Sequence, residues 1–137
     1  MIPEIFIDTS GLVAALAEKD ERHAGAVACI ERARGTRQRF ITTDYILDET
    51  VSVLQSRNVA HYIAPLFERI FAAQLCRVEW MDQDGFHSVK NFLLRHSDKG
   101  WSFTDCFSFV VMKQRGITEA LSSDRHFKQA GFKPLLA

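Results

Sequence analysis

Short apolar runs alternate with longer segments of helical pattern along this chain. The runs have the length of buried strands, and the segments between them repeat apolar residues every three to four positions. Strands that alternate with helices predict an α/β fold, in which a mostly parallel sheet carries helices on both faces. We expect strands at residues 5–7, 40–42, 76–80 and 120–122, and an edge strand within 132–136. We expect helices at residues 12–17, 21–34, 44–57, 60–73, 84–96 and 103–115, and a helical turn from Asp124 through Gln129.

The bulk composition predicts one globular domain over residues 1–137. Lys and Arg number 17, as do Asp and Glu, so the formal net charge is zero and any nucleic-acid contact would depend on local basic patches. The three cysteines form no CxxC pair, which argues against a thiolate zinc site. The first residues do not resemble a signal peptide, and no apolar run has the length of a membrane span. We therefore expect a cytoplasmic protein without membrane contact.

Four acids, Asp8, Glu49, Asp105 and Asp124, stand where segments change character or at the edge of an apolar stripe. In an α/β fold such junctions gather at one rim of the sheet. Like charges in one pocket repel unless a cation neutralises them, so this pattern indicates a divalent-metal site. Each aspartate also has an alternative explanation as a helix-capping or first-turn residue.

Helix phase separates Glu49 from its neighbour Asp48. Asp48 shares its face with polar residues, whereas Glu49 shares its face with Ile46 and Val53. We therefore expect Asp48 to be solvated and Glu49 to be half-buried. A carboxylate on an apolar edge needs a cation, a hydrogen-bond donor or a proton as its partner, and an arginine elsewhere in the fold is the alternative to a metal.

The chain resembles the PIN-domain family, the metal-dependent ribonucleases that include VapC-type toxins. The matching pieces are Phe6-Ile7-Asp8-Thr9-Ser10, Glu49, Ser102-Phe103-Thr104-Asp105 and Ser123-Asp124-Arg125-His126-Phe127. The resemblance implies a three-layer α/β/α sandwich with about five strands. It also implies a pocket in which Asp8, Glu49, Asp105 and Asp124 bind Mg²⁺ or Mn²⁺ and catalyse RNA cleavage. Hydroxyl groups would support the acids from Ser10, Thr104 and Ser123.

The same resemblance implies an RNA substrate, a cognate antitoxin protein and a homodimer. Candidate RNA-binding cations near the acids in sequence are Lys99, Arg125 and Lys128, and four arginines between residues 32 and 39 form a second cluster. For any single one of these cations a solvated surface position is the simpler expectation. Trp101 either stacks on a base or packs in the core. For His126 we favour a surface or packing role over a ligand or general base.

Two other classes remain open. The first is a non-catalytic PIN-like scaffold that has kept the acids, which would bind metal without turning over RNA. The second is a receiver-type phosphoacceptor domain, which usually has two acids directly after the first strand, where this chain has only Asp8. A haloacid-dehalogenase-like phosphatase would need Asp-x-Asp there, and Ser10 stands at the second position.

Overall fold

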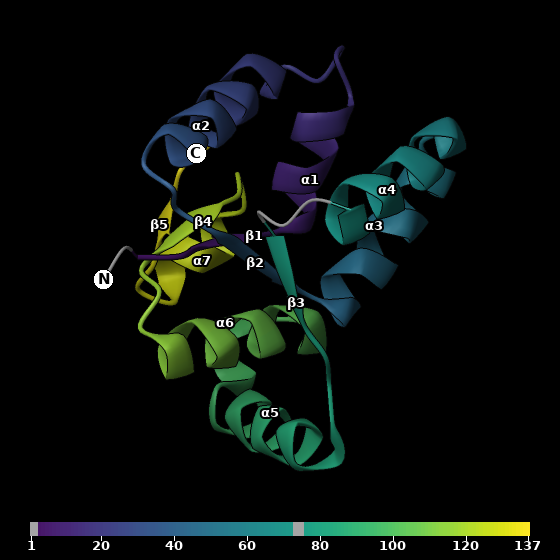
Figure 1. Cartoon of the computed structure of the whole chain (residues 1–137). Coiled ribbons are helices and arrows are strands. Elements are labelled where there is room, and N and C mark those ends of the chain that lie inside the picture. Colours follow the sequence, from purple (N-terminus) through teal and green to yellow (C-terminus); the bar gives the residue numbers. More distant parts are fainter. Residues whose placement is uncertain (1–2, 73–75) are drawn as a thin grey trace.

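The computed structural model describes residues 3–72 and 76–137, and this part of the chain forms a five-stranded, all-parallel sheet (Figure 1). The strands are β1 (Ile5–Ile7), β2 (Phe40–Thr43), β3 (Cys76–Glu79), β4 (Glu119–Leu121) and β5 (Lys133–Pro134). Their order across the sheet is β3-β2-β1-β4-β5, and every neighbouring pair is parallel. The predicted α/β fold is confirmed, although the last edge strand is shorter than expected.

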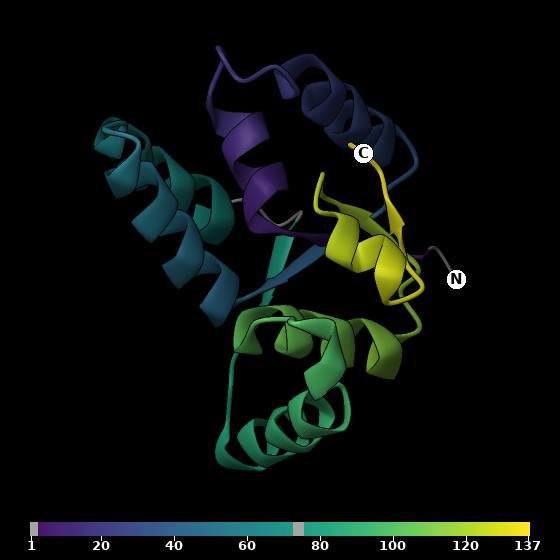
Figure 2. The same cartoon turned by 180° about the vertical axis from the view of Figure 1, so that it is seen from behind.

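Seven α-helices belong to the described residues. They are α1 (Thr9–Leu16), α2 (His23–Gly35), α3 (Asp44–Ser56), α4 (Ile63–Ala72), α5 (Gln83–Arg95), α6 (Phe103–Arg115) and α7 (Arg125–Gln129). In Figure 1, α1, α2 and α4 lie above the sheet while α5 and α6 lie below it, and Figure 2 shows α7 in front of β4 and β5. The sheet is therefore the middle layer of three. No helix in residues 3–72 and 76–137 has the length and apolar character of a membrane span.

Helix α6 has the bounds that its sequence predicts, because both of its ends are specified locally. Ser102 Oγ accepts a hydrogen bond from the amide of Asp105, and the Asp105 carboxylate accepts one from the amide of Ser102. This reciprocal capping box starts the helix. At the other end Gly116 adopts φ 67°, a left-handed conformation that glycine tolerates at little cost. Between them the helix is buried on most sides, as expected from its apolar sequence.

Other boundaries differ from the prediction. Residues 60–73 divide into a 3₁₀ turn (Ala60–Tyr62) and α4, which places Pro65 in the first turn of α4, where proline is tolerated; residue 73 lies outside the described part. Residues 97–100, expected as a loop, include the 3₁₀ turn Ser97–Lys99. The sequence predicts Asp44 as the N-cap of α3, but the cap is Thr43, whose Oγ1 accepts from the amide of Ile46 at 3.1 Å.

The buried face of α2 also differs from the expected one. The apolar pattern of residues 21–34 predicts that Ala24, Val27, Ala28 and Ile30 point inward, but the first three are exposed. The buried residues are Ala26, Cys29 and Ala33. Ala26 packs against Ala14 and Ala15 of α1. These small side chains let the two helices approach closely, and this contact, which the local pattern does not contain, sets the rotation of α2.

Candidate metal centre

The acids gather where the strand order reverses. From β1 the chain proceeds outward to β2 and β3, and it later returns to place β4 on the other side of β1. In open α/β sheets, ligands bind at the carboxyl ends of the strands at such a switch point. Ile7 and Leu121 are register partners at the ends of β1 and β4. The next residues, Asp8 and Ser122, therefore emerge side by side.

Asp8 is buried, with 5% of its surface exposed, at the junction of β1 and α1. It occupies the N-cap position of α1, but its side chain makes no capping hydrogen bond. Instead, Oδ2 accepts hydrogen bonds from Ser122 Oγ at 2.9 Å and from Ser10 Oγ at 3.4 Å. The capping explanation is therefore wrong for this aspartate, and its carboxylate is directed toward the end of β4.

Burial raises the pKa of Asp8 from 3.8 to about 7. The hydrogen bonds from Ser122 and from the Thr9 amide lower this pKa, and the negative charges of Glu49 and Asp124 raise it further. Among the described residues no Lys or Arg forms an ion pair with Asp8. In the part of the chain that the structure describes, the site therefore holds a carboxyl group beside which no Lys or Arg supplies a neutralising charge.

Glu49 enters the same site from α3. It is partly buried while Asp48 is exposed, so the prediction from helix phase is confirmed. Thr9 Oγ1 donates a hydrogen bond to Glu49 Oε1 at 2.6 Å. Burial raises the pKa of Glu49, the Thr9 bond lowers it, and the charges of Asp105 and Asp124 raise it. Glu49 and Asp124 thus act on the charge of Asp8, and Asp105 and Asp124 act on the charge of Glu49, so the four acids form one electrostatically linked group.

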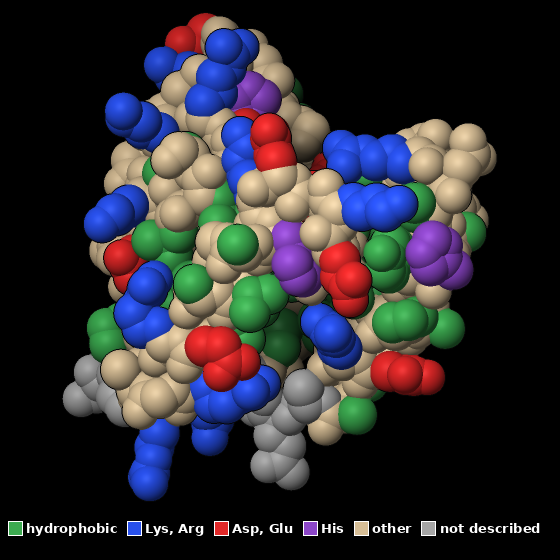
Figure 3. All heavy atoms as spheres, turned by 90° about the horizontal axis from the view of Figure 1, so that it is seen from above, with side chains coloured by type: hydrophobic (Ala, Val, Ile, Leu, Met, Phe, Trp, Pro, Cys, Tyr) green, Lys and Arg blue, Asp and Glu red, His purple; other side chains and the backbone are tan. Residues whose placement is uncertain are grey.

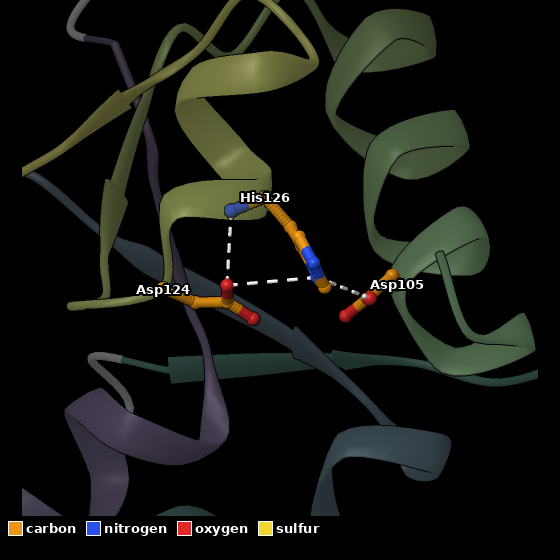
Figure 4. A group of neighbouring side chains, drawn as sticks. All are labelled: Asp105, Asp124 and His126. Atoms are coloured by element: carbon orange, nitrogen blue, oxygen red, sulfur yellow. Dashed lines mark hydrogen bonds and ion pairs between the residues drawn. The ribbon is translucent and has the colours of Figure 1, made fainter. Parts of the chain in front are cut away.

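Asp105 and Asp124 do cap their helices, as the alternative explanation holds. Asp105 Oδ2 accepts from the amide of Ser102, and Asp124 Oδ1 accepts from the amide of His126 at 2.9 Å. The caps do not remove these acids from the site. Oxygen atoms of Asp105 and Asp124 and a ring nitrogen of His126 lie within 4.8 Å of one another (Figure 4). Capping therefore fixes the orientation of two carboxylates that face a common space.

A cavity of about 370 Å³ opens beside these residues. Its lining includes Asp8, Glu49 and Asp124, whereas Asp105 adjoins the site through Asp124 and His126. The cavity is also lined by Asp20, Glu21 and Arg22 of the loop between α1 and α2, and by Arg57, which directly follows α3. Figure 3 shows Lys and Arg side chains spread over the upper face, with acidic side chains among them. A larger cavity of about 510 Å³, between α1, α2 and α4, contains none of the four acids.

The donor set fits a hard divalent cation. Four carboxylates and the nearby hydroxyls of Thr9, Ser10 and Ser122 supply oxygen ligands or hydrogen bonds that orient them. Within residues 3–72 and 76–137 no Lys or Arg forms an ion pair with any of the four acids, and the only basic side chain in contact with them is His126. Mg²⁺ or Mn²⁺ would supply the positive charge that this cluster lacks.

The predicted supporting hydroxyls have different surroundings. Ser10 Oγ contacts Asp8 and accepts from the amide of Ser123, which lines the cavity. For Thr104 the described contacts include only its carbonyl oxygen, which accepts from Ser108 Oγ. Thr9 and Ser122 were missed by sequence reasoning. Their positions in the sequence could have indicated them. Ser122 directly follows the end of β4, and Thr9 directly follows Asp8.

The predicted RNA-binding cations are not among the residues that line the cavity. Lys99 pairs with Asp98 at 3.7 Å, and Arg125 and Lys128 are exposed residues of α7. Arg22 and Arg57 line the cavity and were not predicted. Trp101 is buried, with 6% of its surface exposed, and its ring packs against the rings of Phe92 and Phe109, so its packing role is confirmed.

Comparison with known proteins places this geometry in a family. The PIN domain family matches residues 5–133, and the chain belongs to this family. The chain is a homologue of the VapC20 toxin endonuclease. It is 33% identical over 129 residues to the "23S rRNA-specific endonuclease VapC20" of two Mycobacterium tuberculosis strains, CDC 1551 / Oshkosh and H37Rv, and the match covers 93% of this chain and 95% of the relative.

Solved structures of other proteins have the same fold. The crystal structure of Mycobacterium tuberculosis VapC20, described as a Sarcin-Ricin loop cleaving toxin, superposes with a TM-score of 0.79 at 30% identity over 94% of this chain and 96% of that one. PAE2754 from Pyrobaculum aerophilum superposes with a TM-score of 0.67 at 14% identity over 97% of this chain and 84% of that one, which supports the fold alone. The predicted family and fold are confirmed.

Proposed function

We propose that this protein is a divalent-metal-dependent endoribonuclease of the VapC type, in which Asp8, Glu49, Asp105 and Asp124 bind the metal. The observation that carries the proposal is the buried Asp8 carboxylate, whose pKa is raised to about 7 beside other acids and without a Lys or Arg partner in the described chain. Burying a carboxylate among other acids with no cation beside it is costly even when it accepts hydrogen bonds, and a metal ion would offset this cost. Mg²⁺ and Mn²⁺ are the cofactors that this oxygen-rich site suits.

In this proposal, hydroxyl groups and helix caps hold the four metal-binding acids in place. Ser122 and Ser10 hold Asp8 by hydrogen bonds, Thr9 holds Glu49, and the caps of α6 and α7 hold Asp105 and Asp124. Fixed carboxylates bind without a further loss of side-chain freedom. A divalent cation bound there supplies positive charge that polarises the scissile phosphate and lowers the pKa of an attacking water.

The substrate we propose is RNA, and ribosomal RNA in particular. The relatives named as 23S rRNA-specific endonucleases support this choice. Arg57 supports it from the structure, because it lines the cavity and makes no ion pair among the described residues. A guanidinium at the rim of an acidic metal site can bind a phosphate group. Lys99, Arg125 and Lys128 remain candidates for contacts further along the RNA.

We further propose that the protein is the toxin of a type II toxin–antitoxin pair, acts in the cytoplasm and forms a homodimer. The VapC homology supports an antitoxin partner. The dimer rests on the family resemblance and on apolar surface of α4, where the exposed rings of Phe67 and Phe71 stack. Coexpression with the protein of a neighbouring short reading frame, followed by copurification, tests the antitoxin.

The decisive experiment compares two adjacent acids of α3. Glu49→Gln should abolish Mg²⁺-dependent cleavage of ribosomal RNA, because Glu49 faces the site, whereas Asp48→Asn should leave it intact, because Asp48 is exposed. Asp8→Asn and Asp105→Asn should behave like Glu49→Gln. Retained cleavage in purified, folded Glu49→Gln would contradict the mechanism. Calorimetric metal binding by the wild type without cleavage of any RNA would favour the scaffold alternative.

A further inference from the structure

His126 lies between two acids of the site. Its Nδ1 atom is 3.0 Å from Asp105 Oδ2 and 3.6 Å from Asp124 Oδ1 (Figure 4). The ring is partly buried, with 29% of the side chain exposed. His126 comes from α7, Asp105 from the first turn of α6 and Asp124 from the junction before α7. Two elements far apart in sequence thus bring a nitrogen and two carboxylates to one point.

The spacing of these atoms suits shared coordination of one ion. Ligands at right angles around a small divalent cation, with bonds of about 2.1 Å, lie about 3 Å apart. The two distances from Nδ1 are close to that separation. The amide of His126 donates to Asp124 Oδ1, which fixes the backbone beside that carboxylate, and the 3.0 Å contact of Nδ1 with Asp105 Oδ2 holds the ring itself. The imidazole is therefore held on the acids and is not a freely rotating surface group.

We propose that His126 is a nitrogen ligand of the metal centre, so that the site prefers first-row transition-metal dications, such as Mn²⁺ or Co²⁺, over Mg²⁺. This inference rests on the proposed function, since it assumes that the acids bind a metal. Imidazole nitrogen is a softer donor than carboxylate oxygen, and Mg²⁺ coordinates oxygen almost always. A site with only the four acids would lack this basis for discrimination.

The alternative is that Nδ1 carries a hydrogen and donates it to Asp105, which would make His126 a positioning residue. The variant His126→Asn separates the two roles. Its side-chain amide stands near the place of Nδ1 and can still donate to a carboxylate, but it supplies no imidazole ligand. His87 on α5 is exposed and serves as a matched control through His87→Asn.

The test uses Mn²⁺ as the probe on the full chain, without RNA. Pulsed electron paramagnetic resonance should detect a directly coordinated nitrogen in the wild type and in His87→Asn, and this signal should be absent in His126→Asn. By calorimetry, His126→Asn should bind Mn²⁺ on the order of 10-fold or more weakly, with little change for Mg²⁺. Circular dichroism of each variant checks that it is folded.

The outcomes distinguish two failures. If Mn²⁺ binding depends on Asp8 but shows no nitrogen coupling, and His126→Asn keeps the ratio of Mn²⁺ to Mg²⁺ affinity, the assignment of His126 as a ligand is overturned while the metal site stands. If Mn²⁺ binding is equally strong in Asp8→Asn and Glu49→Gln, or if no binding is detected, the proposed metal site itself is overturned. Unfolding of His126→Asn leaves the nitrogen signal of the wild type as the deciding measurement.

Discussion

Thr9 Oγ1 donates a hydrogen bond of 2.6 Å to Glu49 Oε1, and this bond joins the start of α1 to α3 across 40 residues of sequence. Thr50 Oγ1 lies 3.2 Å from the same hydroxyl, so the residues that follow both acids in the chain also touch one another. Asp8 and Glu49 are thereby placed by the contact of their neighbours. The distance between the two acids is set by packing between α1 and α3 and not by a loop.

Removal of this bond should weaken the site more than the fold. Thr9→Val keeps the shape of the side chain but lacks the hydroxyl, so the pKa of Glu49 should rise further and metal affinity near neutral pH should fall. A buried hydrogen bond to a charged group contributes about 1.5–3 kcal/mol, which corresponds to roughly 10- to 100-fold in affinity. Calorimetric titration with Mg²⁺ measures this. Thr9→Ser, which keeps the hydroxyl, should bind almost as the wild type does, and equal losses in both variants would show that the bond is unimportant.

The raised pKa of Asp8 predicts that the metal-free protein loses stability as the pH rises. The folded protein holds this proton up to about pH 7, whereas the unfolded chain releases it near pH 3.8. Between these values the folded state binds more protons, so the free energy of unfolding should fall by about 1.4 kcal/mol per pH unit at most. Asp8→Asn lacks this titration and should be more stable than the wild type at pH 8 in chelator.

Urea denaturation at pH 5, 6, 7 and 8 with and without Mg²⁺ checks this prediction. The stability difference between Asp8→Asn and the wild type should grow with pH up to about 7, and Mg²⁺ should stabilise the wild type but not Asp8→Asn. Asp48→Asn, at an exposed position, should follow the wild type. Parallel pH profiles for Asp8→Asn and the wild type would show that Asp8 is ionised in the folded state without metal.

The fold and the placement of Glu49 could be predicted because their signals are local. Apolar runs and helix period are properties of neighbouring residues, and the phase of α3 alone separates Glu49 from Asp48. The capping box of Ser102 and Asp105 is also written within four residues. Asp8 was harder, because a cap and a site residue have the same sequence context and only the absence of a capping bond distinguishes them.

What could not be predicted depends on long-range geometry. Ser122 reaches Asp8 because β1 and β4 are neighbours with Ile7 opposite Leu121, and strand register across 114 residues is not visible in a local pattern. His126 touches Asp105 because α7 stands beside the start of α6. A histidine after a capping aspartate carries no sign of this contact. The acids are found through their positions in sequence, and their partners only through packing.

Arg57 should contribute to RNA binding and not to catalysis. It lines the acidic cavity, and in the part of the chain that the structure describes it forms no ion pair. Arg57→Ala should therefore raise KM with little change in kcat, and the dependence of RNA affinity on salt should fall by about one phosphate contact. Steady-state cleavage kinetics of Arg57→Ala check KM and kcat, and RNA binding by Arg57→Ala in the cleavage-inactive Glu49→Gln background, measured over a range of salt concentrations, checks the salt dependence. Arg95→Ala, at the exposed end of α5, is the control. If both variants lose RNA affinity equally, Arg57 contributes only general positive charge and not a specific phosphate contact.

Gly11 should be the most sensitive glycine of the fold, because α1 approaches the end of β4 at this residue. A Cβ atom there would lie 2.1 Å from the carbonyl oxygen of Leu121, and a backbone atom cannot move aside cheaply. Gly11→Ala should therefore push α1 away from β4, separate Asp8 and Ser10 from Ser122, and destabilise the protein by roughly 1–3 kcal/mol, as overpacking does. Gly35→Ala, in α2 with no atom within 4 Å of the added carbon, should be neutral or stabilise by up to about 1 kcal/mol. Denaturant unfolding of both variants, together with Mg²⁺ titration, checks this prediction. If Gly11→Ala is as stable as Gly35→Ala and its metal affinity is unchanged, the contact between α1 and β4 does not position the site.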